Sequence, residues 1–278
     1  MYGVASSGDT STCSSTHAPY SAGHHCVRDL VVVSWNMDGR LLPNLARPDF
    51  RTSIEQCDVF FVQETHLRPD QKDMLRCIEG FDSWTMSRKM LEGQDTYGGV
   101  CAFTRKSLNA RLDGERSSAD IMVLRIGDMH FINAYVAGEH SSASRHFSDW
   151  QALHPWDTFS VLVREMSEAG LAFSVHGDLN GRSGVLCPSG LEHPPRIAED
   201  MVVNSQGRKL VELCEENNLC LVNGCTTIPG NHHGFTFFGR KNTELDLGKS
   251  TVDYVDRPGI GPGLNLFIFS SSAIVLKA

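Results

Sequence analysis

Short runs of β-branched and aromatic residues recur along the chain and predict buried β-strands. These runs cover residues Leu30–Trp35, Asp58–Gln63, Gly98–Phe103, Ile121–Ile126, His130–Val136, Ala172–His176 and Leu219–Val222. Gly127 and Asp128, which separate two of the runs, fit the turn of a β-hairpin. The pattern therefore predicts several buried strands and at least one hairpin.

Longer stretches between these runs place apolar residues at helical spacing. They cover Phe50–Gln56, Pro69–Glu79, Trp156–Glu168 and Ser205–Asn217, and the last of them starts at a serine. Prolines and glycines at 184–195 predict an exposed loop. Because strand–helix units stand beside hairpin-like strand pairs, we expect an α/β fold of mixed sheets with helices outside them.

Acids and amides follow the predicted strands at the points where the chain leaves the sheet. Strand ends of this kind converge on a crevice in open α/β folds. Any one such residue is explained equally well as part of a turn, but repeated occurrence of the same kind favours a shared site. The residues concerned are Asn36, Asp38, Glu64, Asp178, Asn180 and Asp253.

Carboxylates that gather in one place repel each other unless a cation or a proton compensates their charge. A set of Asp, Glu and Asn oxygens suits Mg²⁺ or Mn²⁺ and suits zinc poorly. Glu64 is the best candidate for direct ligation, followed by Asp38 and Asn36. The remaining polar residues are then available to handle a water molecule and a leaving group.

The first 28 residues are rich in Ser, Thr, Gly and His and contain few large apolar residues. Such a segment cannot bury enough surface to offset its ordering entropy, so we expect a flexible tail at 1–28 and one domain at 29–278. No apolar run is long enough to span a membrane. The nine cysteines are scattered singly, which favours reduced thiols in an intracellular location, cytoplasmic or nuclear.

The net charge of −8 counts mildly against binding of nucleic acid, because a basic surface would have favoured it. A polyanionic substrate would have to be held by local cations, a metal ion included. No partner protein is implied by the sequence.

Seven motifs together resemble those of the endonuclease/exonuclease/phosphatase superfamily, in the same order. They are SWNMDGR, QETHL, YGGVCAF, INAYV, GDLNG with the helix–strand segment NSQGRKLVELCEENNLCLVNG after it, HHGFTFF and STVDYV. They extend from Leu30 to about Tyr254. The pair WNMDG and QETHL is most similar to apurinic/apyrimidinic endonucleases and to the endonuclease domains of non-LTR retrotransposons.

The resemblance implies a four-layer sandwich of two mixed β-sheets flanked by helices, which is the deoxyribonuclease I-like architecture. It implies a metal-dependent phosphodiesterase, and DNA as the substrate. The roles it implies are metal ligation by Asn36, Asp38 and Glu64, assistance to the attack by Tyr135, activation of water by Asp178, transition-state stabilisation by Asn180, and orientation of a terminal histidine by Asp253.

The chain departs from the family at its end, where a Ser-Asp-His motif is expected. No histidine follows His233, and Ser270, Ser271 and Ser272 match only the first residue of that motif. We therefore expect the C-terminal end of the domain to be truncated or altered. Loss of the histidine would lower the rate on the order of 10²–10⁴-fold.

Three functions follow as alternatives: a retroelement-type DNA endonuclease, an inactive relic or nucleic-acid-binding module, and a phosphatase for a small phosphoester. Two histidines are given structural roles. We expect His66 to shape its loop and His176 to be a hydrogen-bonded core residue. Trp35 and Phe237 are expected in the core.

Overall fold

The computed structural model describes residues 30–89, 96–139, 141, 151–189 and 195–225, together with the backbone of short strands at 237–238, 249–250, 253–256 and 274–275. The tail expected at 1–28 lies outside the described residues, as do Ser270–Ser272.

The first sheet has four strands in the order β1-β2-β4-β3. Strands β1 and β2 are parallel and the other pairs are antiparallel. The bounds are Val32–Asn36 for β1, Val59–Gln63 for β2, Phe81–Met86 for β3 and Val100–Arg105 for β4.

The second sheet has six strands in the order β12-β11-β8-β7-β6-β5. It is also mixed, since β7 is parallel to β8 and β11 is parallel to β12, whereas the other neighbours are antiparallel. The bounds are Arg111–Leu112 for β5, Ile121–Ile126 for β6, Met129–Tyr135 for β7, Ala172–Asp178 for β8, Asp253–Asp256 for β11 and Ile274–Val275 for β12. A separate pair joins β9 (Phe237–Phe238) and β10 (Lys249–Ser250).

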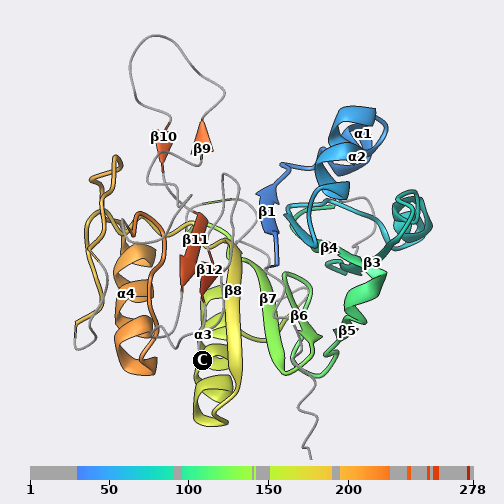
Figure 1. The fold of residues 1–278 in the computed structure, drawn as a ribbon. Coiled ribbons are helices and arrows are strands. Elements are labelled where there is room, and N and C mark those ends of the chain that lie inside the picture. Colours follow the sequence, from blue (N-terminus) through green and yellow to red (C-terminus); the bar gives the residue numbers. More distant parts are fainter. Residues whose placement is uncertain are drawn as a thin grey trace, which may run out of the picture.

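Helices cover the outer faces of the two sheets (Figure 1). One core lies between the first sheet and the segment that carries α1 (Leu41–Leu45), α2 (Pro48–Glu55) and the 3-10 helix η1 (Pro69–Leu75). The larger core lies between the sheets and beneath α3 (Pro155–Glu168) and α4 (Ser205–Asn217). The short 3-10 helix η2 spans Lys106–Leu108. The predicted four-layer sandwich of two mixed sheets is confirmed.

A buried polar link crosses the otherwise apolar space between the sheets. The side-chain amide of Gln63 donates to Asn133 Oδ1 at 2.5 Å and to Ser34 Oγ at 2.8 Å. Asn133 in turn donates to the carbonyl oxygens of Val62 and Cys101 at 3.2 and 2.9 Å. Because buried amides are costly unless they are paired, this link favours one alignment of the two sheets over others.

Most predicted elements form within one or two residues of their expected bounds. Helix α4 and strand β6 have the expected bounds, and Gly127 adopts a φ of +60° in the turn of the β6–β7 hairpin. His176 is a buried core residue whose Nε2 lies 3.0 Å from Ser174 Oγ, as expected. Burial lowers its pKa to about 3, so the ring is neutral.

Three expectations are wrong in detail. Leu219–Val222 is buried but irregular, with an isolated bridge at Leu221 in place of a strand. The stretch from Pro69 forms a 3-10 helix that ends at Leu75. Trp35 is 45% exposed because β1 is an edge strand, although its ring lies 6.0 Å from that of Phe50.

Among the described residues, no helix is long and apolar enough to cross a membrane. The cysteines of this part of the chain are free thiols, and five of them are buried: Cys57, Cys101, Cys214, Cys220 and Cys225.

Replacing Asn133 by leucine is expected to lower the free energy of unfolding by about 1–3 kcal/mol, because the Gln63 amide loses a buried acceptor. Urea titration followed by circular dichroism measures the loss. The double variant Gln63→Met/Asn133→Leu should lose less free energy of unfolding than the sum of the two single variants. In the double variant neither carboxamide of the Gln63–Asn133 bond is left without the other. A loss below about 0.5 kcal/mol in Asn133→Leu would show that the link does not stabilise the fold.

Candidate active site

One amide group joins the two sheets at the predicted site. Asn36, at the end of β1, donates from Nδ2 to Glu64 Oε1 and to Asp178 Oδ2, each at 2.7 Å. Its own Oδ1 accepts the backbone N–H of Asp38 at 3.0 Å, which fixes the orientation of the amide. Two carboxylates distant in sequence therefore meet at a single nitrogen.

Glu64 lies directly after β2 and has further polar neighbours. His66 Nε2 is 3.4 Å from Glu64 Oε2. Burial alone would raise the pKa of Glu64, but its interactions with His66, Asn36 and Tyr135 outweigh burial and lower the pKa. Glu64 is therefore ionised at neutral pH, and its side chain is still 20% exposed.

The pKa of Asp178, the last residue of β8, is shifted in the opposite direction from that of Glu64. Burial, followed by the charge of Glu64, raises its pKa to about 7, although bonds from the Asn180 backbone and from Asn36 oppose the shift. The residue is only 5% exposed. A carboxyl group that exchanges its proton near neutral pH is suited to general base catalysis. The different environments of Glu64 and Asp178 thus separate the two carboxylates into different protonation roles.

Register aligns three predicted site residues across the second sheet. Tyr135 of β7 lies opposite Asp178 of β8, which lies opposite Asp253 of β11. Burial and the charges of Glu64 and Asp178 raise the pKa of Tyr135 well above its ordinary value, so its hydroxyl is a donor. The side chain of Asp253 lies outside the described residues.

The remaining two predicted residues lie at the edge of this group. Asp38 is exposed and joins the group through its backbone amide. Asn180 donates from Nδ2 to the carbonyl of Val136 at 3.0 Å, while its backbone N–H donates to Asp178 Oδ1 at 2.9 Å. The Asn36 amide thus joins Glu64 and Asp178, Tyr135 lies in register beside Asp178, and Asn180 and Asp38 are linked to this group through the backbone.

Several of these residues occupy the left-handed region of backbone conformation. The φ angles are +46° for Asp38 and +49° for Glu64, His66 and Asn180. Such conformations cost about 1–3 kcal/mol each and cluster at functional sites. Gly39 makes one of these turns possible, since a Cβ at that position would lie 2.5 Å from His66 Nδ1.

The described residues contain no group of three or more His, Cys, Asp or Glu side chains that could hold a metal ion. They do offer two carboxylates, those of Glu64 and Asp178, which meet at the neutral Asn36 amide. This arrangement fits Mg²⁺, which typically uses one or two carboxylates and keeps several waters.

No protein family model and no curated protein sequence matches the chain. Solved structures do. A 3'-5' exonuclease from Neisseria meningitidis matches with a TM-score of 0.52 and 15% identity, over 88% of this chain and 86% of that one. An AP endonuclease from Leishmania major gives a TM-score of 0.55 and 14% identity, over 88% and 78%. An AP endonuclease from Archaeoglobus fulgidus gives 0.52 and 14%, over 88% and 85%.

The chain shares the fold of these solved nucleases. The fold implied by the seven motifs is therefore confirmed, including its likeness to that of AP endonucleases. At identities of 14–15% the likeness establishes the architecture, and the site has to be argued from the residues of this chain.

Sequence reasoning missed a buried ion pair behind Tyr135. Arg88 Nε donates to Asp120 Oδ2 at 2.8 Å, and the other oxygen of Asp120 accepts the backbone N–H of Gly99 at 2.7 Å. The Arg88 guanidinium lies 5.8 Å from the centre of the Tyr135 ring. Only the glycine pair in YGGV could have signalled this contact, since nothing in the sequence near Asp120 distinguishes it from a turn residue.

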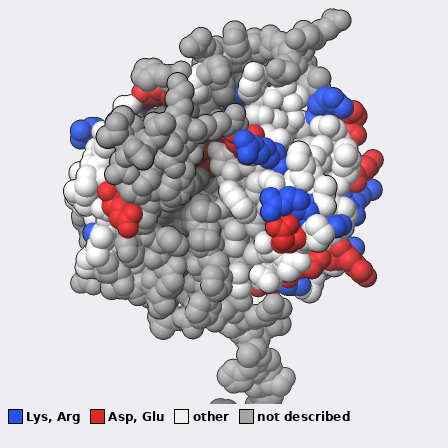
Figure 2. Space-filling view, turned by 90° about the horizontal axis from the view of Figure 1, so that it is seen from above, with Lys and Arg blue, Asp and Glu red and all other residues white. Residues whose placement is uncertain are grey.

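The charges on one face of the molecule are mixed in sign. Figure 2, seen from above, shows Lys and Arg side chains interspersed with Asp and Glu over the coloured part of this face. A surface cavity of about 750 Å³ lies at the opposite end of β6 and β7, where Arg111, Arg125 and His130 line it, and it contains none of the predicted site residues.

In metal-free protein, Asp178 is expected to make stability depend on pH. Because its folded pKa of about 7 is above the ordinary 3.8, the stabilising contribution is complete below about pH 4 and is lost as pH rises through 7. The free energy of unfolding of the parent, relative to Asp178→Asn, should therefore fall between about pH 4 and pH 8. Urea titrations in EDTA measure this difference.

Asp113→Asn provides a control of opposite sign. Bonds from Arg116 outweigh burial and lower the pKa of Asp113, so its contribution is lost as pH falls. A flat difference between the parent and Asp178→Asn across this pH range would contradict the proton assigned to Asp178.

Proposed function

We propose that the chain is a divalent-metal-dependent phosphodiesterase that acts as a DNA endonuclease of retroelement type. The observation that carries the proposal is the Asn36 amide, which brings an ionised Glu64 and a proton-exchanging Asp178 to one point. Hydrolysis of a phosphodiester needs a base for the attacking water and a cation for the phosphate charge, and this pair supports both needs.

Glu64 would hold Mg²⁺ or Mn²⁺, with waters completing the coordination. The exposed Asp38 is close enough along the chain to contribute an outer contact. When bound, the cation supplies positive charge beside the phosphate oxygens. Its presence would also relieve the repulsion between Glu64 and Asp178 and so lower the pKa of Asp178.

The residues of the chain would handle the protons. Asp178 takes a proton from the attacking water, and its buried setting makes it basic enough to do so near neutral pH. Asn180 presents amide hydrogens to the phosphate without adding negative charge. Tyr135 keeps its proton, because burial and the nearby carboxylates raise its pKa, and Asp253 lies in register beside Asp178.

DNA is proposed as the substrate on two grounds. The motifs WNMDG and QETHL resemble those of endonucleases, and one structural neighbour is a 3' phosphatase from Neisseria bound to a product DNA hairpin. The overall charge of −8 opposes DNA binding, so the cation and local arginines would have to provide the attraction. The free thiols of the described part support an intracellular location.

A second candidate is an inactive relic or a nucleic-acid-binding module. It is favoured by Ser270, Ser271 and Ser272, which match only the first residue of the Ser-Asp-His motif that the family resemblance implies. A phosphatase acting on a small phosphoester is a third alternative, and it would hydrolyse such a compound without cutting DNA.

Nicking of supercoiled plasmid in Mg²⁺ tests the proposal. Glu64→Gln keeps the size of the side chain but removes its charge, so the nicking rate should fall by about 10²-fold or more. Glu55→Gln, an exposed glutamate at the end of α2, is the matched control and should nick like the parent. Equal nicking by the parent and Glu64→Gln would refute the assignment.

If the parent nicks no plasmid in either Mg²⁺ or Mn²⁺, the second candidate is favoured. A Ser272→His variant then separates two causes. If the variant nicks plasmid, the parent is an enzyme disabled by the missing histidine. If the variant also nicks no plasmid, the chain is an inactive relic.

A further inference from the structure

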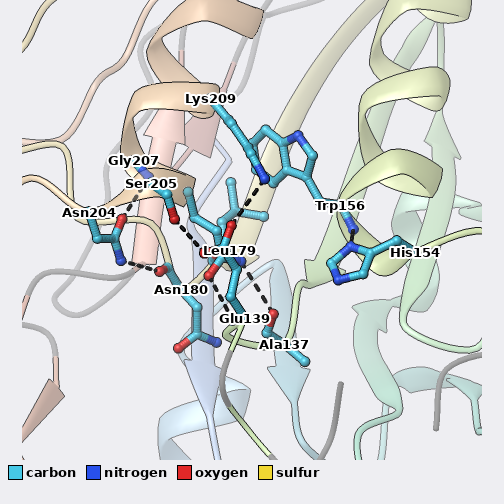
Figure 3. A network of polar contacts seen from close by, with 11 residues as sticks. Ala137, Glu139, His154, Trp156, Leu179, Asn180, Asn204, Ser205, Gly207 and Lys209 are labelled. Atoms are coloured by element: carbon cyan, nitrogen blue, oxygen red, sulfur yellow. Dashed lines mark hydrogen bonds and ion pairs between the residues drawn. The ribbon is translucent and has the colours of Figure 1, made fainter. Parts of the chain in front are cut away.

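The loop that carries Asn180 lies beyond the end of β8. Asn180 lies two residues beyond the start of this loop at Asp178 and has a φ of +49°, which residues other than glycine seldom adopt. Its conformation therefore depends on contacts from elsewhere. Figure 3 shows that the first turn of α4 supplies them.

Asn204, the N-cap of α4, holds the loop from its outer side. Its Oδ1 accepts the backbone N–H of Arg182 at 2.9 Å and that of Gly207 at 2.7 Å, and its Nδ2 donates to the Asn180 carbonyl at 3.0 Å. The backbone N–H of Asn204 donates to the Arg182 carbonyl at 2.9 Å. The start of the helix and the loop therefore form one hydrogen-bonded unit.

Gln206 joins this loop to the loop that follows β7. Its Nε2 donates to the carbonyls of Leu179 and Ala137 at 3.4 and 3.2 Å, and its Oε1 accepts the backbone N–H of Glu139 at 3.3 Å. The residue is 3% exposed, and both polar atoms of its carboxamide are used. One buried side chain thus bridges the segments that follow Tyr135 and Asp178, beside the bond from Asn180 Nδ2 to the Val136 carbonyl.

The helix backbone also approaches the loop directly. A Cβ at Gly207 would lie 2.0 Å from the Arg182 carbonyl oxygen, so only glycine fits there. The exposed contacts at the same place contribute less. Glu139 pairs with Lys209 at 3.0 Å and with Ser205 at 2.5 Å, but Lys209 is 44% exposed, and exposed pairs of this kind add little.

We infer that Gln206 is a positioning residue for the proposed phosphodiester reaction, acting through Asn180. The inference rests on the proposed function and adds a residue that touches neither substrate nor cation. The reason is geometric: the amide of Asn180 must meet the phosphate within a fraction of an ångström. The buried carboxamide of Gln206 ties the loop of Asn180 to the loop that ends in Glu139, in addition to the direct bond from Asn180 Nδ2 to the Val136 carbonyl.

The test compares Gln206→Met with Asn217→Leu in the full chain. Both variants remove a buried carboxamide from α4 and replace it by an apolar side chain of similar size. Asn217 donates only to the Leu213 carbonyl of its own helix at 2.8 Å, so its variant reports helix stability alone. Gln206→Met should lower kcat on plasmid DNA about 10–100-fold with little change in KM, and Asn217→Leu should leave kcat unchanged.

A double-mutant cycle separates positioning from general destabilisation. If Gln206 acts through Asn180, Gln206→Met should cost less than about 3-fold in kcat when Asn180 is already alanine. If Gln206→Met lowers kcat by the same factor whether residue 180 is asparagine or alanine, the inference is overturned. So would a kcat that is unchanged in Gln206→Met.

Amide hydrogen exchange provides a readout that does not need activity. Exchange in residues 179–183 and 136–139 should become faster on the order of tenfold in Gln206→Met and stay unchanged in Asn217→Leu. If the parent cuts no DNA, the proposed function is refuted. If amide exchange is unchanged in Gln206→Met, the positioning role of Gln206 is refuted, whether or not the parent cuts DNA.

Discussion

The candidate site depends on the two hydrogen bonds that one side-chain amide, that of Asn36, gives to Glu64 and Asp178. Asn36 and Glu64 follow strands of the first sheet, whereas Asp178 ends a strand of the second. The bond from Asn36 to Asp178 therefore forms only if the two sheets are correctly aligned. The Gln63–Asn133 link, one residue before Glu64, favours that alignment from within the core. Gln63, which helps to align the sheets, and Glu64, which is the proposed ligand of the cation, are therefore adjacent at the end of β2.

The site also combines local strain with rigid support. Glu64 and His66 adopt left-handed conformations that are unfavourable for their side chains, and Asn180 does so in the neighbouring loop. The energetic cost of these conformations is offset by hydrogen bonds with neighbouring segments of the fold. Backbone bonds from the 98–99 segment hold Thr65 and His66, and the first turn of α4 holds the loop of Asn180. Residues outside the reacting group, such as Gln206, consequently determine where the reacting atoms lie.

Much of this organisation could be predicted from the sequence, because buried strands and amphipathic helices leave periodic patterns. Strand β6 and helix α4 are examples, and the polar residues at strand ends gave Asn36, Glu64 and Asp178. Other elements were missed for physical reasons. Strand β3 (Phe81–Met86) mixes polar and apolar residues without a clean alternation, and α1 (Leu41–Leu45) contains a proline. The contacts of Gln206 depend on tertiary packing, which local spacing does not record.

We propose that Glu64 holds a divalent cation beside Asp178. The sharpest test is anomalous diffraction from crystals of the full chain grown in Mn²⁺. If Glu64 binds the ion, a manganese peak will lie at bonding distance from its carboxylate and will be lost in crystals of Glu64→Gln. A peak bonded elsewhere, or no peak at Glu64 at saturating Mn²⁺, would contradict it.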